Sequence, residues 1–402
     1  MSLISVEEAL QRVLASARLL GDETIAIDEA HGRTLATPLV SKRTQPPFDA
    51  SAMDGYAVRG ADIAVVGTAL RVVGEAAAGH GFNGELGAME AVRIFTGAPV
   101  PKGADTILLQ EYARREGDTV LVETSEVTGR HIRHTGLDFA KGDPLLKAGH
   151  RLNERSLALA AAMDHGALTV HRKPRVAILA TGDELVRPGE AARHDQIVAS
   201  NHLTVAALVR AAGGEPVQLG IAGDSFFALE RGIIAAEAEH ADILVTLGGA
   251  SVGDHDLVQS ALARRGMELG FWRIAMRPGK PLIHGRLGAM AILGLPGNPV
   301  SSYVCARLFL MPLIRQMQGD PDAAHDPTEP AILGCDVRQN DKRQDYLRSN
   351  LVNDPGGLPV ATPYDVQDSS MIRVCAEAGA LVLRPPHAPP QRKGEKCRII
   401  RL

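Results

Sequence analysis

The sequence predicts a multidomain α/β and β protein with a doubly wound parallel sheet in its central domain. Three observations support this fold class. The chain has 402 residues, which is too many for one ordinary hydrophobic core. Apolar strand-like segments alternate with helical patterns between residues 174 and 325. Residues 47–140 and 326–402 contain mainly short β-like runs and turns. We therefore expect separate domains on both sides of a central sheet.

The N-terminal segment is expected to be helical and to belong to a discontinuous linker domain of residues 1–46 and 141–173. Ser5 and Glu8 have the spacing of a capping box, and apolar residues then recur on one helical face. A second helical pattern runs over residues 153–163. Both pieces flank a region of different composition, which indicates an insertion.

The inserted region, residues 47–140, is expected to be a small β-rich domain. It is rich in glycine, and the Gly117-Asp118 pair between two apolar runs is a hairpin signal. The C-terminal region, residues 326–402, has short strand-like runs and a turn at residues 354–357. It is expected to form a small β-barrel.

The central domain, residues 174–325, begins with an apolar run at 175–180 that shows no alternation, as expected of a strand buried on both faces. The other elements expected here are helices at 201–212, 225–239, 256–265 and 299–318 and strands at 216–220, 242–247 and 289–295. Ligands of such sheets bind at the carboxyl ends of the strands. The loops that follow the strands are therefore the candidate binding site.

Composition excludes several classes of function. The hydrophobic share of 45% and charged share of 22% are typical of a soluble globular protein. The formal net charge of -4 argues against nonspecific nucleic-acid binding and against a polybasic membrane-binding patch. Glu7 and Glu8 lie where a signal peptide would be basic, and no apolar run is long enough to span a membrane. The four cysteines are too widely spaced for a CxxC pair, so we expect a reduced, cytoplasmic compartment.

Four loops after predicted strands, at 180–185, 220–224, 247–256 and 295–301, are expected to form a cradle for an anion. Glycine lets the backbone approach a ligand, and N–H groups at helix starts favour phosphate. Serine hydroxyls add donors. The candidate substrate-binding residues in these loops are Thr181, Gly182, Gly248, Gly249, Ser251, Gly253, Pro296, Gly297, Asn298 and Ser301.

Three carboxylates, Glu184, Asp224 and Asp256, accompany this cradle. Because carboxylates repel phosphate, the combination suggests a cation between them, and Mg²⁺ bound by one or two carboxylates and a substrate phosphate is the expected cofactor. Asp224 and Asp256 also stand where helix N-caps belong, so capping is the alternative reading for both.

A basic segment at 272–281 carries Arg273, Arg277 and Lys280 around a Pro-Gly turn. Pro278 and Pro281 fix the turn, which favours an anion-binding role for the three cations. A solvated edge strand with charged side chains is the alternative.

One pattern points to different chemistry. Residues 249–253 match G-x-S-x-G, the nucleophile elbow of serine hydrolases, with Ser251 as nucleophile. Downstream acid and histidine candidates exist in Asp320 with His325 and in Asp326 with His387, but their spacing does not support a triad. A serine hydrolase is therefore a remote alternative.

Six segments, taken together and in order, resemble the MoeA family of molybdopterin molybdenumtransferases. They are residues 47–59, 96–101, 181–185, 249–253, 278–281 and 295–301. The resemblance implies that the central domain is similar to the MogA-like adenylyltransferase and binds the pterin. It also implies an enzyme that takes adenylyl-molybdopterin and molybdate, releases AMP with a divalent cation and leaves molybdenum on the dithiolene.

The resemblance also implies roles for individual residues. Arg348 and Ser369 match the family's proposed molybdate contacts, and Asp54, Asp138, Glu184, Asp224 and Asp256 match its functional acids. From the basic segment we expect Lys280 to join the molybdate contacts, Arg273 to join the substrate-binding set, and Arg277 and Lys280 to join the catalytic set. Arg273 and Arg277 replace lysines that many relatives carry, and an aspartate, Asp368, stands where glycine is usual.

The family resemblance implies a homodimer in which each active site is shared, with Asp54 acting in the site of the other subunit. The alternative is that Asp54 and Gly55 merely form a turn pair. A molybdopterin adenylyltransferase, molybdoenzymes and their chaperones are candidate partners. The rival of a different class is a non-catalytic pterin-binding or scaffold protein of the gephyrin type.

Overall fold

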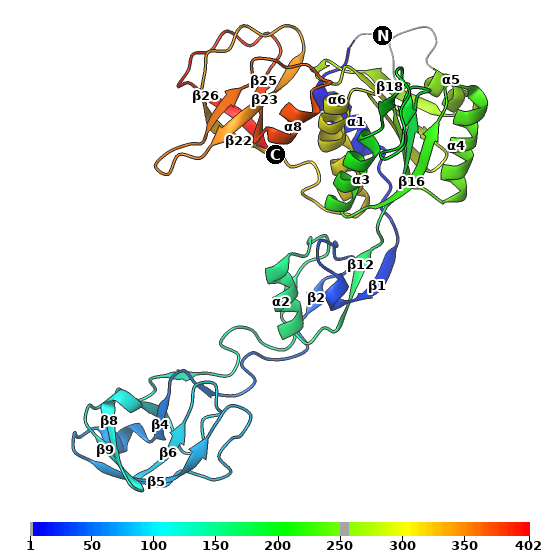
Figure 1. The fold of residues 1–402 in the computed structure, drawn as a ribbon. Coiled ribbons are helices and arrows are strands. Elements are labelled where there is room, and N and C mark those ends of the chain that lie inside the picture. The colour runs from blue at the N-terminus through cyan, green and yellow to red at the C-terminus, as the bar shows by residue number, and fades with distance from the viewer. Residues whose placement is uncertain (1–2, 250–256) are drawn as a thin grey trace.

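The protein is described here by a computed structural model that covers residues 3–249 and 257–402. Its elements form an elongated molecule (Figure 1). The inserted β-rich domain lies at one end, a slender linker domain follows, and the α/β domain and the C-terminal barrel form the larger body at the other end. Among the residues described, no helix is both long and apolar enough to cross a membrane.

The α/β domain contains a six-stranded sheet in the order β16-β13-β17-β21-β20-β18. The first four strands are parallel, whereas β20 and β18 run antiparallel at one edge. The expected doubly wound sheet is therefore present but mixed, because β20 and β21 form a hairpin rather than a crossover. The strands are β13 (Arg175–Thr181), β16 (Glu215–Ala222), β17 (Ile243–Leu247), β18 (Glu268–Arg273), β20 (Pro281–Leu287) and β21 (Met290–Leu295).

Helices cover both faces of this sheet. One face packs against α3 (Asn201–Ala211) and the continuous helical run of α6 (Pro299–Cys305), a π-helical turn (Ala306–Leu310) and α7 (Met311–Met317). The other face packs against α4 (Phe226–Ala238) and α5 (Leu257–Arg264). Helices on two sides leave the ends of the strands as the open edges of the domain.

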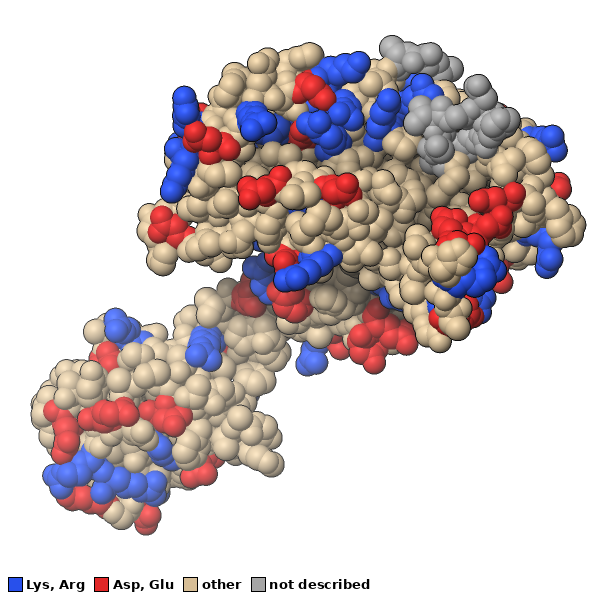
Figure 2. All heavy atoms as spheres, turned by 45° about the horizontal axis from the view of Figure 1, so that its top comes forward, with Lys and Arg blue, Asp and Glu red and all other residues tan. Residues whose placement is uncertain are grey.

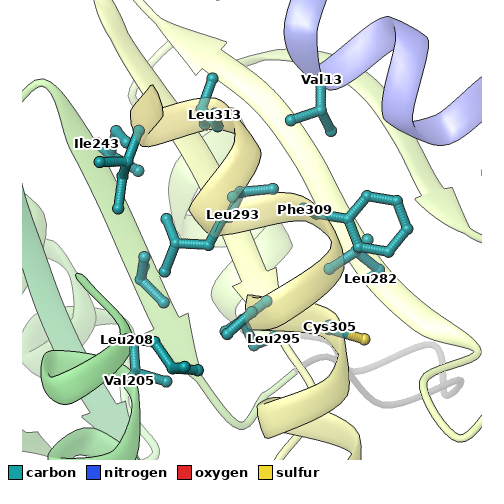
Figure 3. Packing of buried hydrophobic residues seen from close by; sticks show 14 of the residues in the cluster. Val13, Val205, Leu208, Ile243, Leu282, Leu293, Leu295, Cys305, Phe309 and Leu313 are labelled. Carbon is teal, nitrogen blue, oxygen red and sulfur yellow. The ribbon is translucent and has the colours of Figure 1, made fainter. Parts of the chain in front are cut away.

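Helix α1 (Val6–Ala15) differs from expectation in where it packs. Its cap is the predicted one, since the Ser5 side chain accepts from the Glu8 N–H at 3.0 Å. Its buried residues Ala9 and Val13, however, join the core of the α/β domain. Figure 3 shows Val13 on the same side of the cluster as Leu313 of α7. The sequence placed this helix in the linker domain. An amphipathic helix must bury its apolar face, and α7 supplies the surface that the small linker core does not.

The linker domain contains more strand than the sequence predicted. The ribbon of β1 (Asp22–Ala26) and β12 (Ala167–His171) joins it to the α/β domain, and β2 (Leu39–Val40) pairs with β11 (Pro144–Leu146). Its helix is α2 (Glu154–Ala162), which begins at a capping box of Asn153 and Ser156. Short strands paired across the insertion are nonlocal, so local helical patterns could not reveal them.

The inserted domain is β-rich, as predicted, with a six-stranded sheet in the order β7-β4-β6-β5-β9-β8. The predicted hairpin over Gly117 is present as the antiparallel pair β8 and β9. The elements are β3 (Ala50–Ser51), β4 (Gly55–Val58), β5 (Ala69–Ala76), β6 (Glu90–Ile94), β7 (Thr106–Leu109), β8 (Ala113–Glu116), β9 (Thr119–Val122) and β10 (Ile132–Arg133). Its surface carries both signs of charge, while basic side chains gather along the upper edge of the larger body in Figure 2.

The C-terminal domain is the predicted small barrel. Its strands pair in the order β23 (Gln344–Val352), β24 (Val360–Pro363), β22 (Thr328–Leu333), β26 (Lys396–Arg401) and β25 (Ala380–Arg384), and a further β23–β25 pairing closes the ring. Helix α8 (Ile372–Glu377) lies between β24 and β25 in the chain. A short strand of the α/β domain, β19 (Met276–Arg277), pairs in parallel with β23. This pairing joins the barrel to the domain that carries the candidate site.

Candidate functional site

A cavity of about 730 Å³ lies where β13, β17 and β21 end, at the edge of the sheet predicted to bind ligand. Nine of the predicted site residues line it: Thr181, Gly182, Glu184, Asp224, Gly248, Gly249, Pro296, Gly297 and Asn298. Ser251, Gly253 and Asp256 lie outside the described residues. The loops after the strands thus converge on one pocket, as the topology required.

The pocket wall formed by Gly248 and Gly249 requires glycine at both positions. Both have positive φ, +101° and +66°. A Cβ on Gly248 would lie 2.7 Å from the Thr181 carbonyl oxygen, and one on Gly249 would lie 2.3 Å from a Val258 methyl carbon. The wall is therefore bare backbone, which a ligand can approach closely.

The loop before α6 is held from two sides. The Asn201 side-chain amide donates to the Gly297 carbonyl at 2.6 Å, and the Asn298 amide donates to the Ser369 hydroxyl at 2.9 Å. The Val300 N–H donates to the Ser369 carbonyl at 3.0 Å. The loop is thus fixed to α3 and to the C-terminal domain. Ser301 is 5% exposed inside α6 and does not line the cavity, because the helix turns it toward the core.

Two of the three predicted metal-binding acids, Glu184 and Asp224, line the cavity. The capping alternative fails for Asp224, because the N-cap of α4 is Ser225, whose hydroxyl accepts from the Ala228 N–H at 3.2 Å. Asp183, which the sequence analysis passed over, accepts from the Asp224 N–H at 3.0 Å and so fixes the acidic loop. Among the residues described, no group of three or more His, Cys, Asp or Glu side chains is placed to hold a metal.

The predicted cation cluster does not form around the cavity. Arg277 makes a two-pronged ion pair with Asp345 of the barrel, its Nε donating at 2.9 Å. The Arg273 guanidinium lies 3.9 Å from the centre of the Trp272 ring at the end of the edge strand β18. Lys280 lies in the turn between Arg277 and β20, and its carbonyl accepts from the Ile274 N–H at 3.0 Å. Of this segment only Pro281 lines the cavity.

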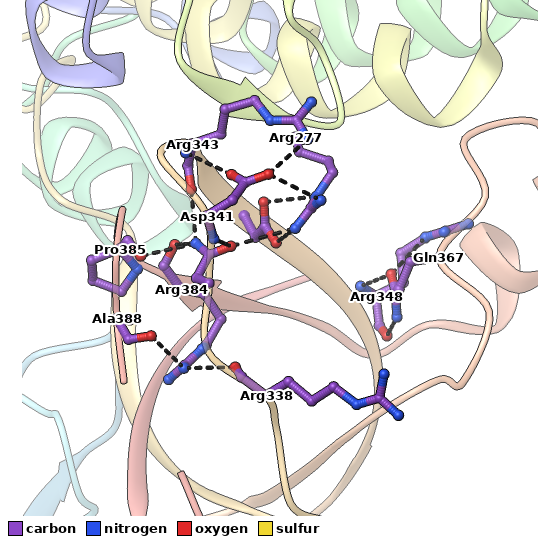
Figure 4. Close-up of polar contacts among 11 residues, drawn as sticks. Arg277, Arg338, Asp341, Arg343, Arg348, Gln367, Arg384, Pro385 and Ala388 are labelled. Carbon is purple, nitrogen blue, oxygen red and sulfur yellow. Dashed lines mark hydrogen bonds and ion pairs between the residues drawn. The ribbon is translucent and has the colours of Figure 1, made fainter. Parts of the chain in front are cut away.

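Arg348 is a buried cation on the barrel strand β23, with 1% of its surface exposed, and it does not line the cavity. Its Nε and backbone N–H both donate to the Gln367 side-chain oxygen, at 3.3 and 3.0 Å (Figure 4). Its Nη1 has no hydrogen-bond partner among the described residues, and burial lowers the pKa of the guanidinium. A buried donor without a partner is costly, and it is a feature that a bound anion would satisfy.

The Asp368 carboxylate forms hydrogen bonds within its own turn. Its carboxylate accepts from the Ser370 N–H at 2.8 Å and the Ser370 hydroxyl at 2.6 Å, contacts that lower the pKa of Asp368. Ser370 and Ile372 line the cavity, so the barrel closes its open side. None of the four residues Ser370, Ile372, Asn201 and His202 carried a local sequence signal. Ser370 and Ile372 reach the pocket through the packing of the C-terminal domain on the α/β domain, and Asn201 and His202 reach it through the packing of α3 on the sheet.

Three family models match the chain in order: the "MoeA N-terminal region (domain I and II)" over residues 4–163, the "Probable molybdopterin binding domain" over 177–316, and the "MoeA C-terminal region (domain IV)" over 330–402. The chain is 36% identical to the molybdopterin molybdenumtransferase of Haemophilus influenzae over 340 residues, 84% of this chain and 83% of that one. It is 39% identical to that of Nostoc sp. over 337 residues, 82% of this chain and 77% of that one. This chain belongs to the MoeA family.

The fold agrees with this assignment. The crystal structure of the molybdopterin biosynthesis protein MoeA from Pyrococcus horikoshii OT3 superimposes with a TM-score of 0.83 at 27% identity, covering 100% of both chains. The likeness therefore extends beyond the pocket to the linker and inserted domains.

The MoeA N-terminal region contains the remaining predicted acids, which lie in another domain than the cavity (Figure 1). Asp54 accepts from the N–H and the hydroxyl of Thr96 at 2.7 and 2.8 Å, which lowers its pKa. Position 55 requires glycine because the neighbouring strand lies very close, and not because a turn occurs there. A Cβ at this position would lie 2.0 Å from the Leu108 carbonyl oxygen. Asp138 is exposed, and its N–H donates to the Gln45 carbonyl at 3.0 Å.

The acids of the serine-hydrolase alternative are engaged elsewhere in this MoeA chain. Asp320 is 3% exposed and accepts from the Arg315 Nε at 2.7 Å. Asp326 accepts from Arg398 at 2.8 Å. Ser251 itself lies outside the described residues. Neither acid is therefore available to orient a catalytic histidine.

Proposed function

We propose that this chain is a molybdopterin molybdenumtransferase that works at the cavity of the α/β domain, inserting molybdate into adenylyl-molybdopterin with release of AMP. The observation that carries the proposal is one cavity that combines backbone-lined glycine loops, the acids Glu184 and Asp224, and a wall from the C-terminal barrel. Such a site accommodates an anionic heterocycle with a pyrophosphate and places a second domain beside it.

The glycine loops and Thr181 hold the pterin and its phosphates in this proposal, since N–H groups of bare backbone suit anions. Glu184 and Asp224, with Asp256, would hold Mg²⁺ beside the substrate phosphates. The two acids that line the cavity fit Mg²⁺, which commonly takes one or two carboxylates and completes its shell with water and substrate phosphate. When bound, the ion would neutralise charge that develops on the leaving AMP.

Molybdate is held by Lys280, Arg348 and Ser369 in this proposal. Arg348 supports the assignment because its Nη1 is buried without a partner among the residues described. Holding the oxyanion beside the dithiolene contributes mainly proximity, which converts a bimolecular encounter into a reaction within one complex. Gln367 fixes the guanidinium before molybdate arrives.

The active unit is a cytoplasmic homodimer with shared sites, in which Asp54, with Asp138, acts at the pocket of the other subunit. Asp54 and Thr96 form one ordered cluster at the start of β4, in a domain separate from the cavity of its own chain (Figure 1). A two-fold dimer would carry two equal composite sites.

The test is incubation of the purified chain with adenylyl-molybdopterin, Mg²⁺ and molybdate, with AMP and bound molybdenum measured together. AMP release that depends on molybdate, with one molybdenum gained for each AMP, is the expected result. Pterin binding without either product would support the pterin-binding or scaffold alternative instead.

A further inference from the structure

The ion pair between Arg277 and Asp345 joins the two domains that enclose the cavity. Arg277 ends β19 of the α/β segment, and Asp345 lies directly opposite on β23 of the barrel. The guanidinium Nε donates to one carboxylate oxygen at 2.9 Å and Nη2 donates to the other. The Gln344 N–H also donates to the Ala275 carbonyl at 2.8 Å. A planar fork that meets a carboxylate in this way fixes direction as well as distance.

Asp345 is buried, so its carboxylate depends on the contact with Arg277. It is 4% exposed, and burial raises the pKa of its carboxyl. The pKa of Arg277 is raised in turn, chiefly by its hydrogen bonds to Asp345. A buried carboxylate without its cation is strongly unfavourable. Arg277 is therefore held by the barrel, and its fork is already occupied by protein.

The turn that follows Arg277 leads directly to the pocket wall. Gly279, with φ of +111°, packs so closely on α6 that a Cβ there would lie 2.5 Å from the Cys305 sulfur. Lys280 is tied back to Ile274 by its carbonyl, and Pro281 lines the cavity. A displacement at Arg277 would therefore be transmitted through four residues to the wall and to Lys280.

Asp345 and Arg348 lie three residues apart on the same strand, β23. We infer that Arg277 is a positioning residue: its pair with Asp345 sets the Lys280 turn and the Arg348 strand in register, so that one anion can contact a cation from each domain. This role differs from the direct substrate contact expected from the sequence. It rests on the proposed function, because the anion in question is molybdate.

The test compares Asp345→Asn, Arg277→Gln and the double variant in the AMP-release assay, with molybdate varied. Asp345→Asn gives the sharpest contrast, because it removes the charged partner and leaves Arg277 in place with its longer contacts, 3.4 Å to the Asn340 side-chain oxygen and 3.5 Å to the Asp341 carboxylate. The positioning role predicts that the KM for molybdate rises by roughly ten- to a hundredfold in each single variant. The double variant should be no worse than the worse single variant, because both changes remove one contact.

A direct contact between Arg277 and substrate gives the opposite pattern. Removing the charged partner of Arg277 by Asp345→Asn would then leave the KM for molybdate unchanged or lower it. Arg277→Gln would also add its full effect in the Asp345→Asn background. Either result overturns the proposal.

The matched control is Asp242→Asn. Asp242 accepts both prongs of Arg172, at 2.8 and 2.6 Å, and stands before β17, at the end of that strand away from the cavity. Loss of this pair should lower the melting temperature and leave the KM for molybdate unchanged. A purely structural role for Arg277 would make Asp345→Asn behave like this control, with a lower melting temperature and an unchanged KM, and would overturn the proposal.

Two further measurements keep the result interpretable. If Asp345→Asn does not fold, Arg277→Lys takes its place in the test. This variant keeps the positive charge but loses the planar guanidinium that binds both carboxylate oxygens. The positioning role predicts a raised KM for molybdate in this variant, whereas a simple charge contact predicts an unchanged KM. If the wild-type chain releases no AMP, the proposed function fails. Non-additive melting temperatures of the single and double variants would still report the pair between the domains.

Discussion

The cavity has a first wall from the α/β domain, which includes bare glycine backbone, and a second wall from the C-terminal domain, of which Ser370 and Ile372 line the cavity. On the first wall, Gly248 and Gly249 expose their peptide groups. In the C-terminal domain, outside the cavity lining, Gln367 holds Arg348 and Asn298 of the α/β domain holds Ser369. A backbone wall depends on local sequence, while a side-chain wall depends on contacts between distant segments. Site residues in the glycine loops can therefore be predicted from the sequence, whereas site residues held by distant side chains can be identified only from the folded structure.

The largest expected effect lies on the first wall. Asp224→Ala should lower AMP release on the order of a hundred- to a thousandfold while the fold is retained, because the acid belongs to the proposed Mg²⁺ site and not to the cap of α4. Ser225→Ala is the matched control next to it. That variant should lose about 1 kcal/mol of stability, the usual value of a cap, and keep its activity. Kinetics and thermal unfolding of both variants provide the measurement. Near wild-type turnover of Asp224→Ala at saturating Mg²⁺ would remove the acid from the site.

The next effect tests whether the inserted domain completes a partner's pocket. Two inactive variants, Asp54→Ala and Asp224→Ala, should regain activity when their subunits are mixed, because each mixed dimer has one intact composite site. With random exchange about half of the dimers are mixed, so roughly a quarter of the sites should work. Exchange is verified by co-purification of differently tagged subunits. Verified mixed dimers that stay inactive would assign Asp54 to its own subunit or to structure alone.

A smaller effect is expected on the barrel wall. Arg348→Ala should raise the KM for molybdate by about ten- to a hundredfold, the value of one hydrogen-bonded charge, with less change in pterin affinity. Arg384→Ala is the control, because Arg384 is also buried in the barrel but donates to the Pro389 carbonyl and the Gln391 side chain. It should destabilise the barrel without altering the molybdate dependence. The comparison fails if Arg348→Ala and wild type respond to molybdate alike.

The smallest effect concerns stability rather than catalysis. His284 is 4% exposed on β20, and burial lowers its pKa from 6.5 to about 4. The unfolded chain therefore binds a proton between about pH 6.5 and 4 that the folded chain does not, so stability is complete above pH 6.5 and falls as the pH drops toward 4. The loss should reach roughly 3 kcal/mol, at about 1.4 kcal/mol per pKa unit. Denaturant unfolding of wild type and His284→Asn at pH 7 and 4.5 measures it, and equal losses in the two proteins would contradict the assignment.

The sequence was most informative where chemistry and local structure coincide. The loops after β13, β17 and β21 were predicted, and with them Thr181, Glu184 and the glycines of the pocket wall, because strand, glycine loop and helix follow one another in the chain. The hairpin over Gly117 was equally local. The antiparallel edge strands β18 and β20 were missed, since apolar runs do not state the direction of pairing.

Other differences between the expected and the observed positions arose from contacts between segments far apart in sequence. Arg277 was expected to be available to bind an anion, because its neighbours in the sequence do not indicate an acidic partner. Its partner Asp345 is 68 residues away in the chain. Helix α1 was placed in the linker domain although its apolar face packs against α7. Ser301 has the pattern of a loop hydroxyl and is buried in α6. In each case the partner that decides the role is distant in the chain, so tertiary packing outweighed the local pattern.

The most direct test of the account is the molybdate dependence of AMP release, measured side by side in wild type, Asp224→Ala and Arg348→Ala. The account predicts that wild type releases AMP only with Mg²⁺ and molybdate, that Asp224→Ala releases almost none at any molybdate concentration, and that Arg348→Ala approaches wild-type rates when molybdate is high. AMP release by wild type without molybdate, or loss in Arg348→Ala that high molybdate does not restore, would contradict a site in which one wall handles the pyrophosphate and the other holds the oxyanion.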